Sequence, residues 1–279
     1  MLLAYDGSRY KGWQRLGRGE LTIQAVLENV ISDVIGYEVE IHGSGRTDAG
    51  VHAKGQVAHM KVPFVLKENV REACNRVLPE DIRILQIIPA KARFHSRYSA
   101  VAKWYQYYVD TTEKPDVFQR KYSCHYPEQL NLTAMKEASR LLLGTHDFSS
   151  FTDEKMLEKE KVRTIYEIKI CERNGKICFS YHGDGFLQHM VRILTGTLLE
   201  VGSGKKKPSE ILTILEKRNR SFAGFMAPAK GLFLEKVEYE ATDENKDDLY
   251  DKLFDKVKDR IKELEEISKN FNVEVKVNE

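Results

Sequence analysis

The stretch His42-Gly43-Ser44-Gly45-Arg46-Thr47-Asp48-Ala49-Gly50-Val51-His52-Ala53 lies between two segments whose apolar patterns predict strands. Val39 and Ile41 alternate before it, and a mixed run over 56–62 follows it. Its glycines allow a tight backbone and the close approach of a ligand. Arg46 and Asp48 place a charged pair in this loop, which makes it a candidate reaction site. A solvated hairpin turn has the same composition, so the rest of the chain has to discriminate between the two interpretations.

The length of 279 residues suits one large domain or two of ordinary size. No apolar run is long enough to span a bilayer and no secretory leader pattern follows Met1, so we expect a cytoplasmic protein with no membrane partner. The four cysteines are scattered, which favours reduced thiols over disulfides or a zinc site. Net charge is only +2, yet most of the excess of cations falls within 1–240, so a local basic surface is compatible with this total.

Two segments, 9–15 and 91–109, interleave cations with aromatic residues. This composition holds phosphates and stacks bases in RNA-binding proteins. A surface loop with anchoring aromatics, or a strand with core aromatics, accounts for the same pattern. Together with one histidine of the opening stretch, the candidate RNA-contacting residues are Arg9, Lys11, Trp13, Arg15, His52, Arg93, His95, Arg97 and Lys103.

Apolar periodicity and cap residues predict two similar halves. In the first half, 1–110, we expect a strand at 2–5, a helix from Thr22 to Gly36, strands at 38–42 and after the loop, a helix over 66–78, a strand over 82–88 and a strand through 101–109. In the second half, 111–242, we expect a helix over 131–142, a turn at 145–148, a hairpin of 163–171 with 176–181, helices over 186–201 and 208–218, and a strand over 232–239. The pattern predicts a pseudo-duplicated α+β fold whose sheets face or extend one another.

The polar stretch 111–129 is the best boundary between the halves, and residues 243–279 form a charged tail with the stripe of an amphipathic helix. Within the helix predicted at 186–201, Arg192 lies on an otherwise apolar segment. A buried arginine in such a helix rarely occurs without a carboxylate partner.

The chain resembles the TruA family of tRNA pseudouridine synthases through six motifs that occur in the family's order. They are Leu3-Ala4-Tyr5-Asp6-Gly7 with Gly12-Trp13-Gln14-Arg15, Gly45 to Ala53, Phe94 to Ala100 with Lys103 and Tyr105, Gly144 to Ser149, Phe186 to Arg192, and Ala227 to Leu232. The resemblance covers about residues 2–240. Trp104 stands where arginine is common, Asp184 where asparagine is common in some members, and the tail after Asp243 has no counterpart.

The resemblance implies that Asp48 is the catalytic aspartate, that Tyr105 stacks on the target uracil and that Arg192 pairs with Asp48. It further implies that Arg46 engages RNA and that Leu232 lines the uracil pocket. The implied protein is a homodimer with antiparallel sheets flanked by helices and a central RNA-binding cleft. It uses no cofactor and no metal, and it isomerises uridines in the anticodon stem-loop of tRNA, at positions 38–40 in family members.

In this reaction the ribose–N1 bond of uridine is cut, the base turns and C5 is joined to the ribose. A carboxylate can attack the sugar covalently or remove a proton from it, and both roles stay open for Asp48. Two related alternatives are a paralogue that acts on another RNA and a catalytically silent RNA-binding relative. A third is a metal hydrolase that uses Asp48 and the histidines His42, His52, His59 and His95, which lack a typical ligand spacing.

Overall fold

The computed structural model describes residues 1–17, 19–153 and 160–240. Residues Met1–Tyr239 form one compact unit, which contains every helix and strand discussed below. The amphipathic helix predicted within 243–279 lies outside the described residues.

The strands are β1 (Leu2–Tyr5), β2 (His42–Gly43), β3 (His52–His59), β4 (Ile82–Gln86), β5 (Ala100–Asp110), β6 (Cys124–His125), β7 (Gly144–Asp147), β8 (Val162–Arg173), β9 (Lys176–Gly183) and β10 (Leu232–Tyr239). The α-helices are α1 (Ile23–Ile35), α2 (Val70–Val77), α3 (Leu132–Arg140), α4 (Met190–Gly202) and α5 (Glu210–Lys217). The expected α+β fold, a large sheet flanked by helices, is confirmed.

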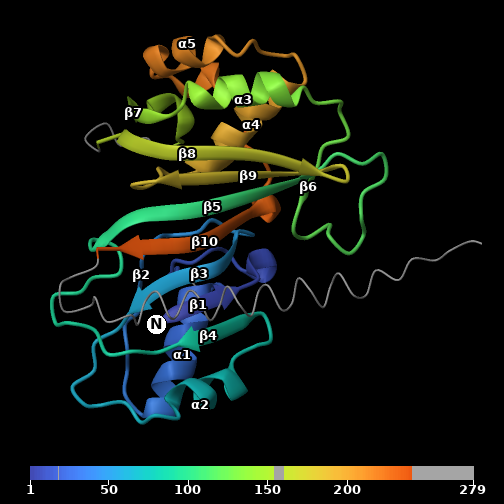
Figure 1. The fold of residues 1–279 in the computed structure, drawn as a ribbon. Helices are drawn as coiled ribbons and strands as arrows, with labels where there is room; N and C mark the ends of the chain where they lie inside the picture. The colour runs from blue at the N-terminus through green and yellow to red at the C-terminus, as the bar shows by residue number, and fades with distance from the viewer. Residues whose placement is uncertain (18, 154–159, 241–279) are drawn as a thin grey trace, which may run out of the picture. The chain divides into compact units, whose positions relative to one another are not determined.

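The strands form one sheet in the order β4-β1-β3-β10-β5-β9-β8-β7, with β2 and β6 paired at its margins. The strands of both predicted halves therefore belong to one continuous sheet rather than to two facing sheets (Figure 1). The last strand, β10, makes the connection: it lies between β3 and β5, parallel to β3 and antiparallel to β5. Most other pairs are antiparallel, as predicted, although β6 also runs parallel to β5.

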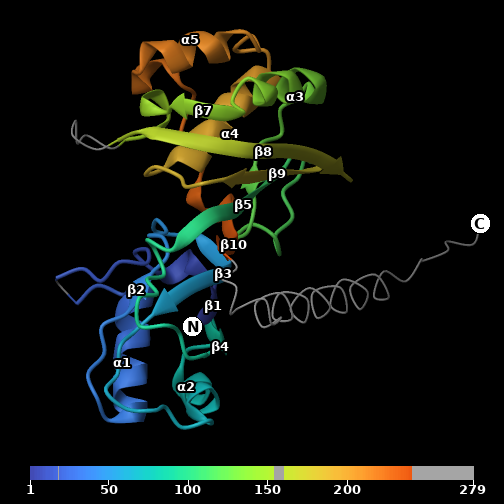
Figure 2. The same ribbon diagram turned by 60° about the vertical axis from the view of Figure 1, so that its left-hand side comes forward.

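Helices α1 and α2 lie beside the β1–β3–β4 end of the sheet, and α3, α4 and α5 gather beside the β7–β8–β9 end (Figures 1 and 2). Local chemistry sets several of their ends. The Thr22 hydroxyl accepts from the Ala25 N–H, and Gly36 ends α1 with φ +69°. Asn131 caps α3 in the same way through the Ala134 N–H. The turn Asn174-Gly175 joins β8 to β9 with positive φ at both residues, as this dipeptide predicts.

The strand predicted at 38–42 is wrong over most of its length, because β2 begins only at His42. Side chains of α1 take the backbone groups that a neighbouring strand would need: the Val39 N–H donates to Ser32 Oγ and the Ile41 N–H donates to Glu28 Oε1. The backbone of these residues is therefore hydrogen-bonded to side chains of α1 rather than to a neighbouring strand. The next strand, β3, begins at His52, so the end of the opening stretch is part of the sheet.

Two other predictions in the second half differ from the structure. The segment predicted as a turn at 145–148 contributes to β7, where Gly144 pairs with Ile165 of β8. The helix predicted from 186 begins only at Met190, because His189 has φ +62° and cannot continue a right-handed helix. Gln188 and His189 instead form a turn, and His189 lies next to Asp48.

Candidate active site

Residues of the N-terminal segment, Tyr5 and Trp13, pack against the loop between β2 and β3 and hold it in place. The Trp13 ring packs so closely on Gly43 that a Cβ there would lie 2.6 Å from a ring carbon. The backbone N–H of Trp13 donates to the Thr47 carbonyl, and the hydroxyls of Tyr5 and Thr47 lie 2.8 Å apart. Trp13 is 2 % exposed. Its predicted contact with RNA is therefore corrected: the ring forms the floor of the loop.

Two side chains hold the backbone immediately before Arg46. Gln56, which is fully buried on β3, accepts a hydrogen bond from Ser44 Oγ and donates one to the Gly45 carbonyl at 2.9 Å. Lys103 on β5 donates from Nζ to the Ser44 carbonyl at 2.7 Å. Burial lowers the pKa of Lys103 to about 8, and Arg97 and Arg163 add to this effect. Lys103, predicted to contact RNA, thus has its ammonium group engaged with the loop.

Asp48 at the end of this loop pairs with Arg192, which lies 144 residues away on α4. Arg192 Nη1 donates to Asp48 Oδ2 at 2.9 Å, and its Nε donates to the Ala227 carbonyl at 2.8 Å. The Asp48 side chain is 24 % exposed and that of Arg192 is 11 % exposed. The carboxylate partner predicted for the buried arginine is therefore present, and it is the aspartate of the opening stretch.

A histidine that the sequence did not single out contacts the same carboxylate. His189 Nε2 lies 3.6 Å from Asp48 Oδ1, and His189 Nδ1 lies 2.8 Å from Asp153 Oδ2. Asp153 also accepts from Arg220 Nε at 3.1 Å. Asp48 is thus bordered by Arg192 on one oxygen and by His189 on the other.

Tyr105 on β5 lies close to this loop, since its hydroxyl would be 3.8 Å from a Cβ on Gly45. Burial, with smaller effects from Tyr5 and Asp48, raises the pKa of the Tyr105 phenol well above its ordinary value. The ring is 8 % exposed, and Phe186 meets it edge-on at 5.3 Å between ring centroids. Leu232 is buried at the start of β10, where it pairs with Tyr107, two residues along β5 from Tyr105. Next to it, Ala229 lies 3.5 Å from the position of a Cβ on Gly50.

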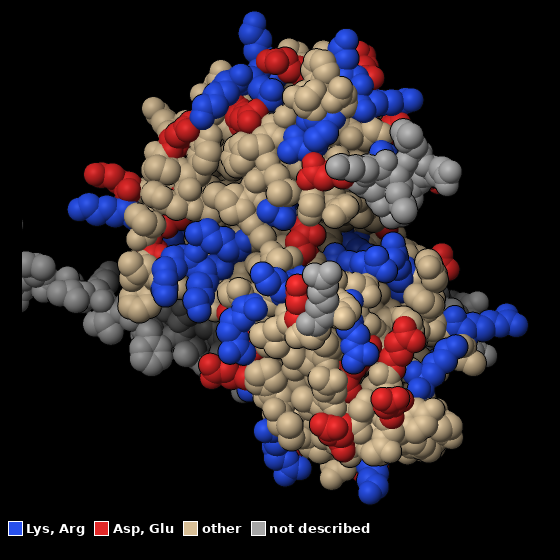
Figure 3. Space-filling view, turned by 180° about the vertical axis from the view of Figure 1, so that it is seen from behind, with Lys and Arg blue, Asp and Glu red and all other residues tan. Residues whose placement is uncertain are grey.

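The remaining candidate RNA contacts divide into exposed and buried residues. Arg46, Lys11, Arg93 and Arg97 are exposed. Arg9 and Arg15 are also exposed but pair with Asp81 and Glu28 respectively. On the face shown in Figure 3, Lys and Arg side chains form a band across the middle of the molecule. The predicted local basic surface is therefore visible despite the low net charge.

His52 is 1 % exposed, so its predicted contact with RNA is also corrected. Its Nδ1 accepts from the Gly7 N–H, and its Nε2 lies within hydrogen-bond distance of the carbonyls of Lys121 and Lys230. The ring therefore joins three separate loops. His95 is partly buried and its Nδ1 accepts from the N–H groups of Arg97 and Tyr98, which stabilises the turn that presents Arg97.

The rings of His42, His59 and His95 lie together, with centroids 4.6–6.0 Å apart. Burial and the neighbouring His95, His42 and Lys61 lower the pKa of His59 to about 4. No group of three or more His, Cys, Asp or Glu residues within the described part of the chain is arranged to hold a metal ion. The metal-hydrolase alternative thus finds no ligand set among these residues.

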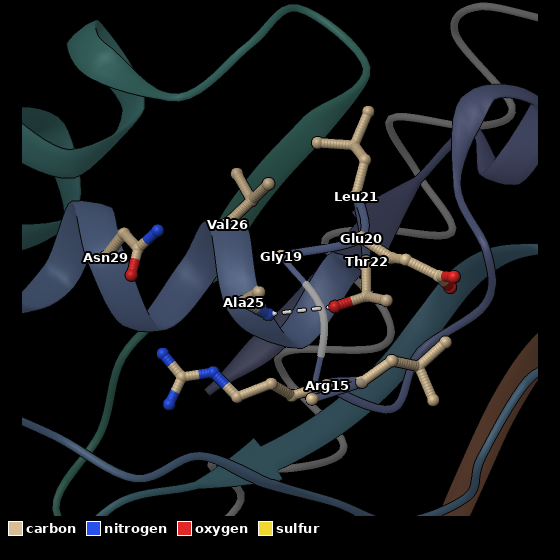
Figure 4. Close-up of a pocket in the computed structure, with 10 residues that line it drawn as sticks. Arg15, Gly19, Glu20, Leu21, Thr22, Ala25, Val26 and Asn29 are labelled. Carbon is tan, nitrogen blue, oxygen red and sulfur yellow. Dashed lines mark hydrogen bonds between the residues drawn. The ribbon is translucent and has the colours of Figure 1, made fainter.

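A hollow of about 400 Å³ lies elsewhere, between residues 15–22 and the first turns of α1 (Figure 4). Its lining includes Arg15, Thr22 and Asn29 but neither Asp48 nor Tyr105. We therefore locate the candidate site by its side-chain chemistry rather than by this hollow.

Comparison with known proteins identifies the family of the chain. A family model described as tRNA pseudouridine synthase matches residues 1–99 and 138–240. The chain belongs to the tRNA pseudouridine synthase family. Both matched segments include residues of the site, since the first carries Asp48 and the second carries Arg192.

Curated members of this family are similar over nearly their whole length. The tRNA pseudouridine synthase A of Bacillus sp. (strain KSM-64) is 49 % identical over 86 % of this chain and 98 % of its own. The tRNA pseudouridine synthase A of Geobacillus kaustophilus (strain HTA426) is 44 % identical over 86 % of this chain and 93 % of its own. A chain of the crystal structure of a Cbf5-Nop10-Gar1 complex is far less similar, at 12 % identity and a TM-score of 0.32 over 72 % of this chain and 54 % of that chain. This last value is too low to define a fold.

Sequence reasoning missed His189, Asp153 and Gln56 in this tRNA pseudouridine synthase family member. His189 belongs to the motif that carries Arg192, so its position three residues before the arginine was an available signal. Gln56 and Asp153 gave no signal, because a glutamine in a strand and an aspartate in a charged loop are both ordinary surface residues in a sequence.

Proposed function

We propose that this protein converts uridine to pseudouridine in tRNA. The observation that carries the proposal is the pairing of the half-buried Asp48 with Arg192, close to the buried Tyr105, in a chain of this family. During the reaction the C1′–N1 bond breaks, the uracil turns and a C1′–C5 bond forms. N1 gains a proton and C5 loses one, so the product is an isomer and no redox step is needed.

We assign the reacting carboxylate to Asp48. It either adds to C1′ or removes a proton from the ribose, and Arg192 supports its ionised form through a charge-assisted hydrogen bond in both cases. The target nucleotide has to leave its stack, at a cost of a few kcal/mol. Stacking on Tyr105, worth about 1–3 kcal/mol for base–aromatic contacts, offsets part of this cost. Because only 8 % of Tyr105 is exposed, the entering base has to displace part of what covers the ring.

The other assignments follow from these. We propose that Arg46 holds the extruded nucleotide, that Leu232 lines the uracil pocket, and that the exposed Lys11, Arg93 and Arg97 contact the phosphates. The substrate is the tRNA anticodon stem-loop, at positions 38–40. The enzyme acts as a homodimer in the cytoplasm, where its substrate occurs. We keep 1–110 and 111–242 as the two halves that build the site, with 243–279 as an added tail.

The test is release of tritium from tRNA labelled at uridine C5. Wild-type protein should release it, whereas Asp48→Asn should not, although it should still bind tRNA. Asp184→Asn is the matched control: Asp184 is a partly exposed aspartate whose Oδ1 only accepts from the Thr164 N–H, so its variant should remain active. Full activity of Asp48→Asn would contradict the assignment of the carboxylate. No release by wild-type protein would contradict the function.

A further inference from the structure

His189 has a backbone conformation that its sequence position does not explain. It is one of three non-glycine residues with positive φ in the described part of the chain, with Asn174 and Arg218. Asn174 occupies a hairpin turn that favours asparagine, and Arg218 occupies the left-handed end of α5. His189 instead precedes the first residue of α4, where φ is +62° and its side chain makes no capping hydrogen bond. Such a conformation costs about 1–3 kcal/mol and concentrates at functional sites.

The strained residue places its ring between two carboxylates. Nδ1 lies 2.8 Å from Asp153 Oδ2 and Nε2 lies 3.6 Å from Asp48 Oδ1. The ring is held from outside, because Arg220 Nε binds Asp153 Oδ1 at 3.1 Å and Arg220 Nη1 binds the Gly224 carbonyl at 2.9 Å. The His189 side chain is 20 % exposed, so the contact with Asp48 is partly shielded from water.

This arrangement restrains the carboxylate of Asp48 at both oxygens. Arg192 alone fixes Oδ2, and the carboxylate could still rotate about that contact. In the doubly protonated ring, Nε2–H points to Oδ1 and restrains it as well, while Nδ1–H donates to Asp153 and keeps the ring in place. The distance of 3.6 Å is longer than a hydrogen bond, and such contacts often shorten only when substrate binds.

We propose that His189 is a positioning residue for Asp48, held in its left-handed conformation by Asp153 and Arg220 so that its Nε2 orients the reacting carboxylate. The inference rests on the proposed function and assigns to His189 a positioning role in it. It acts through Asp48.

Two isosteric variants separate this role from a purely structural one. In His189→Asn the side-chain amide replaces Nδ1, keeps the contact with Asp153 and suits the left-handed backbone. In His189→Gln the amide nitrogen replaces Nε2 and keeps the contact with Asp48. If His189 only anchors the turn to Asp153, the asparagine variant should behave like wild type and the glutamine variant should be impaired.

The proposal predicts the reverse. In the tritium-release assay, kcat of His189→Asn should fall between about 10- and 100-fold, the scale of a misplaced reacting group. KM for tRNA and the thermal unfolding temperature should stay near the wild-type values, and His189→Gln should recover most of kcat. The matched control is His182→Asn, because His182 has the same 20 % side-chain exposure and a Glu238 partner at 3.3 Å but pairs with neither Asp48 nor Arg192. A wild-type kcat in His189→Asn would overturn the inference.

A second measurement does not depend on turnover. The ring resonances of His189 in the NMR spectrum of histidine-labelled protein should change in Asp48→Asn, whereas those of His182 should not. Unchanged His189 resonances would overturn the inference even in an active enzyme. If the His189 resonances change in Asp48→Asn but the wild-type protein releases no tritium, the contact is supported and the proposed function is contradicted instead.

Discussion

Replacement of Lys103 by methionine should leave the fold as stable as before, or more stable, while it lowers activity. Lys103 holds a charge in a half-buried position and donates to a neutral carbonyl, Ser44 O, at 2.7 Å. Its pKa of about 8, against an ordinary 10.5, corresponds to about 3 kcal/mol of destabilisation at pH 7. Methionine removes this cost and preserves most of the side-chain volume, but it leaves the Ser44 carbonyl without its donor, which costs about 1–3 kcal/mol. The net change should lie between zero and about 2 kcal/mol of added stability.

The pH dependence of this difference follows from the direction of the pKa change. Between pH 8 and 10.5 the unfolded lysine binds more protons than the folded one, so wild-type stability rises with pH over this range. The cost of the buried charge falls from about 3 kcal/mol at pH 7 to about 1.4 kcal/mol at pH 9.5. The advantage of Lys103→Met over wild type should therefore shrink by about 2 kcal/mol between these pH values, measured by urea unfolding at each pH.

Activity and a matched lysine complete the test. Because Lys103 fixes the backbone just before Arg46, kcat of Lys103→Met should fall about 10-fold or more with little change in tRNA affinity. Lys54→Met is the control, since Lys54 pairs with the partly buried Glu235 at 2.9 Å and its loss should destabilise the protein. A Lys103→Met variant that is destabilised by more than 2 kcal/mol, with a difference that does not vary with pH, would refute the reasoning.

Two further substitutions test the histidine cluster at His59 and the pairing of Arg192 with Asp48. The low pKa of His59 means that the unfolded chain binds the additional proton between about pH 6.5 and 4, so wild-type stability should be complete above this range and fall within it by about 1–2 kcal/mol after allowance for partial exposure. His59→Asn keeps an acceptor for the Ser96 N–H, and in urea unfolding it should lose less stability than wild type when the pH falls from 7 to 5. Equal losses in the two proteins would exclude this explanation. Arg192→Lys cannot bind both Asp48 and the Ala227 carbonyl, so kcat should fall about 100-fold while tRNA binding persists, and an unchanged kcat would show that the pair is not needed.

Features encoded by neighbouring residues were predictable from the sequence. Thr22 and Gly36 mark the ends of α1, and Asn174-Gly175 marks the hairpin, because caps and tight turns depend on groups only a few residues apart. The strand predicted at 38–42 failed over residues 38–41 for the opposite reason. Glu28 and Ser32 of α1 take its backbone donors, and this competition is visible only after the helix is placed beside it.

The site combines local and distant information. The opening stretch and the buried Arg192 were both recognisable, and the resemblance to the family paired them before the structure did. The geometry itself depends on β10, which enters between β3 and β5 and joins the two halves of the sheet. No local pattern predicts this insertion, because it is set by the packing of the entire chain.

Composition predicted a basic surface correctly but could not assign each member to it. Arg97 is exposed, whereas Trp13 and His52 from the same candidate set are 2 % and 1 % exposed: the Trp13 ring packs on Gly43, and the His52 ring accepts from the Gly7 N–H. Aromatic and histidine side chains serve equally well in cores and at RNA surfaces, so residue type alone does not separate the two.

A map of pseudouridine in cellular tRNA shows whether Asp48 of this protein is needed to make it. Pseudouridine is mapped at single-nucleotide resolution in tRNA from cells that lack this protein and from the same cells supplied with wild type or with Asp48→Asn. We expect that the anticodon stem-loop loses pseudouridine in the deficient cells, regains it with wild type and does not regain it with Asp48→Asn. An unchanged map in the deficient cells, or restoration by Asp48→Asn, would contradict this expectation.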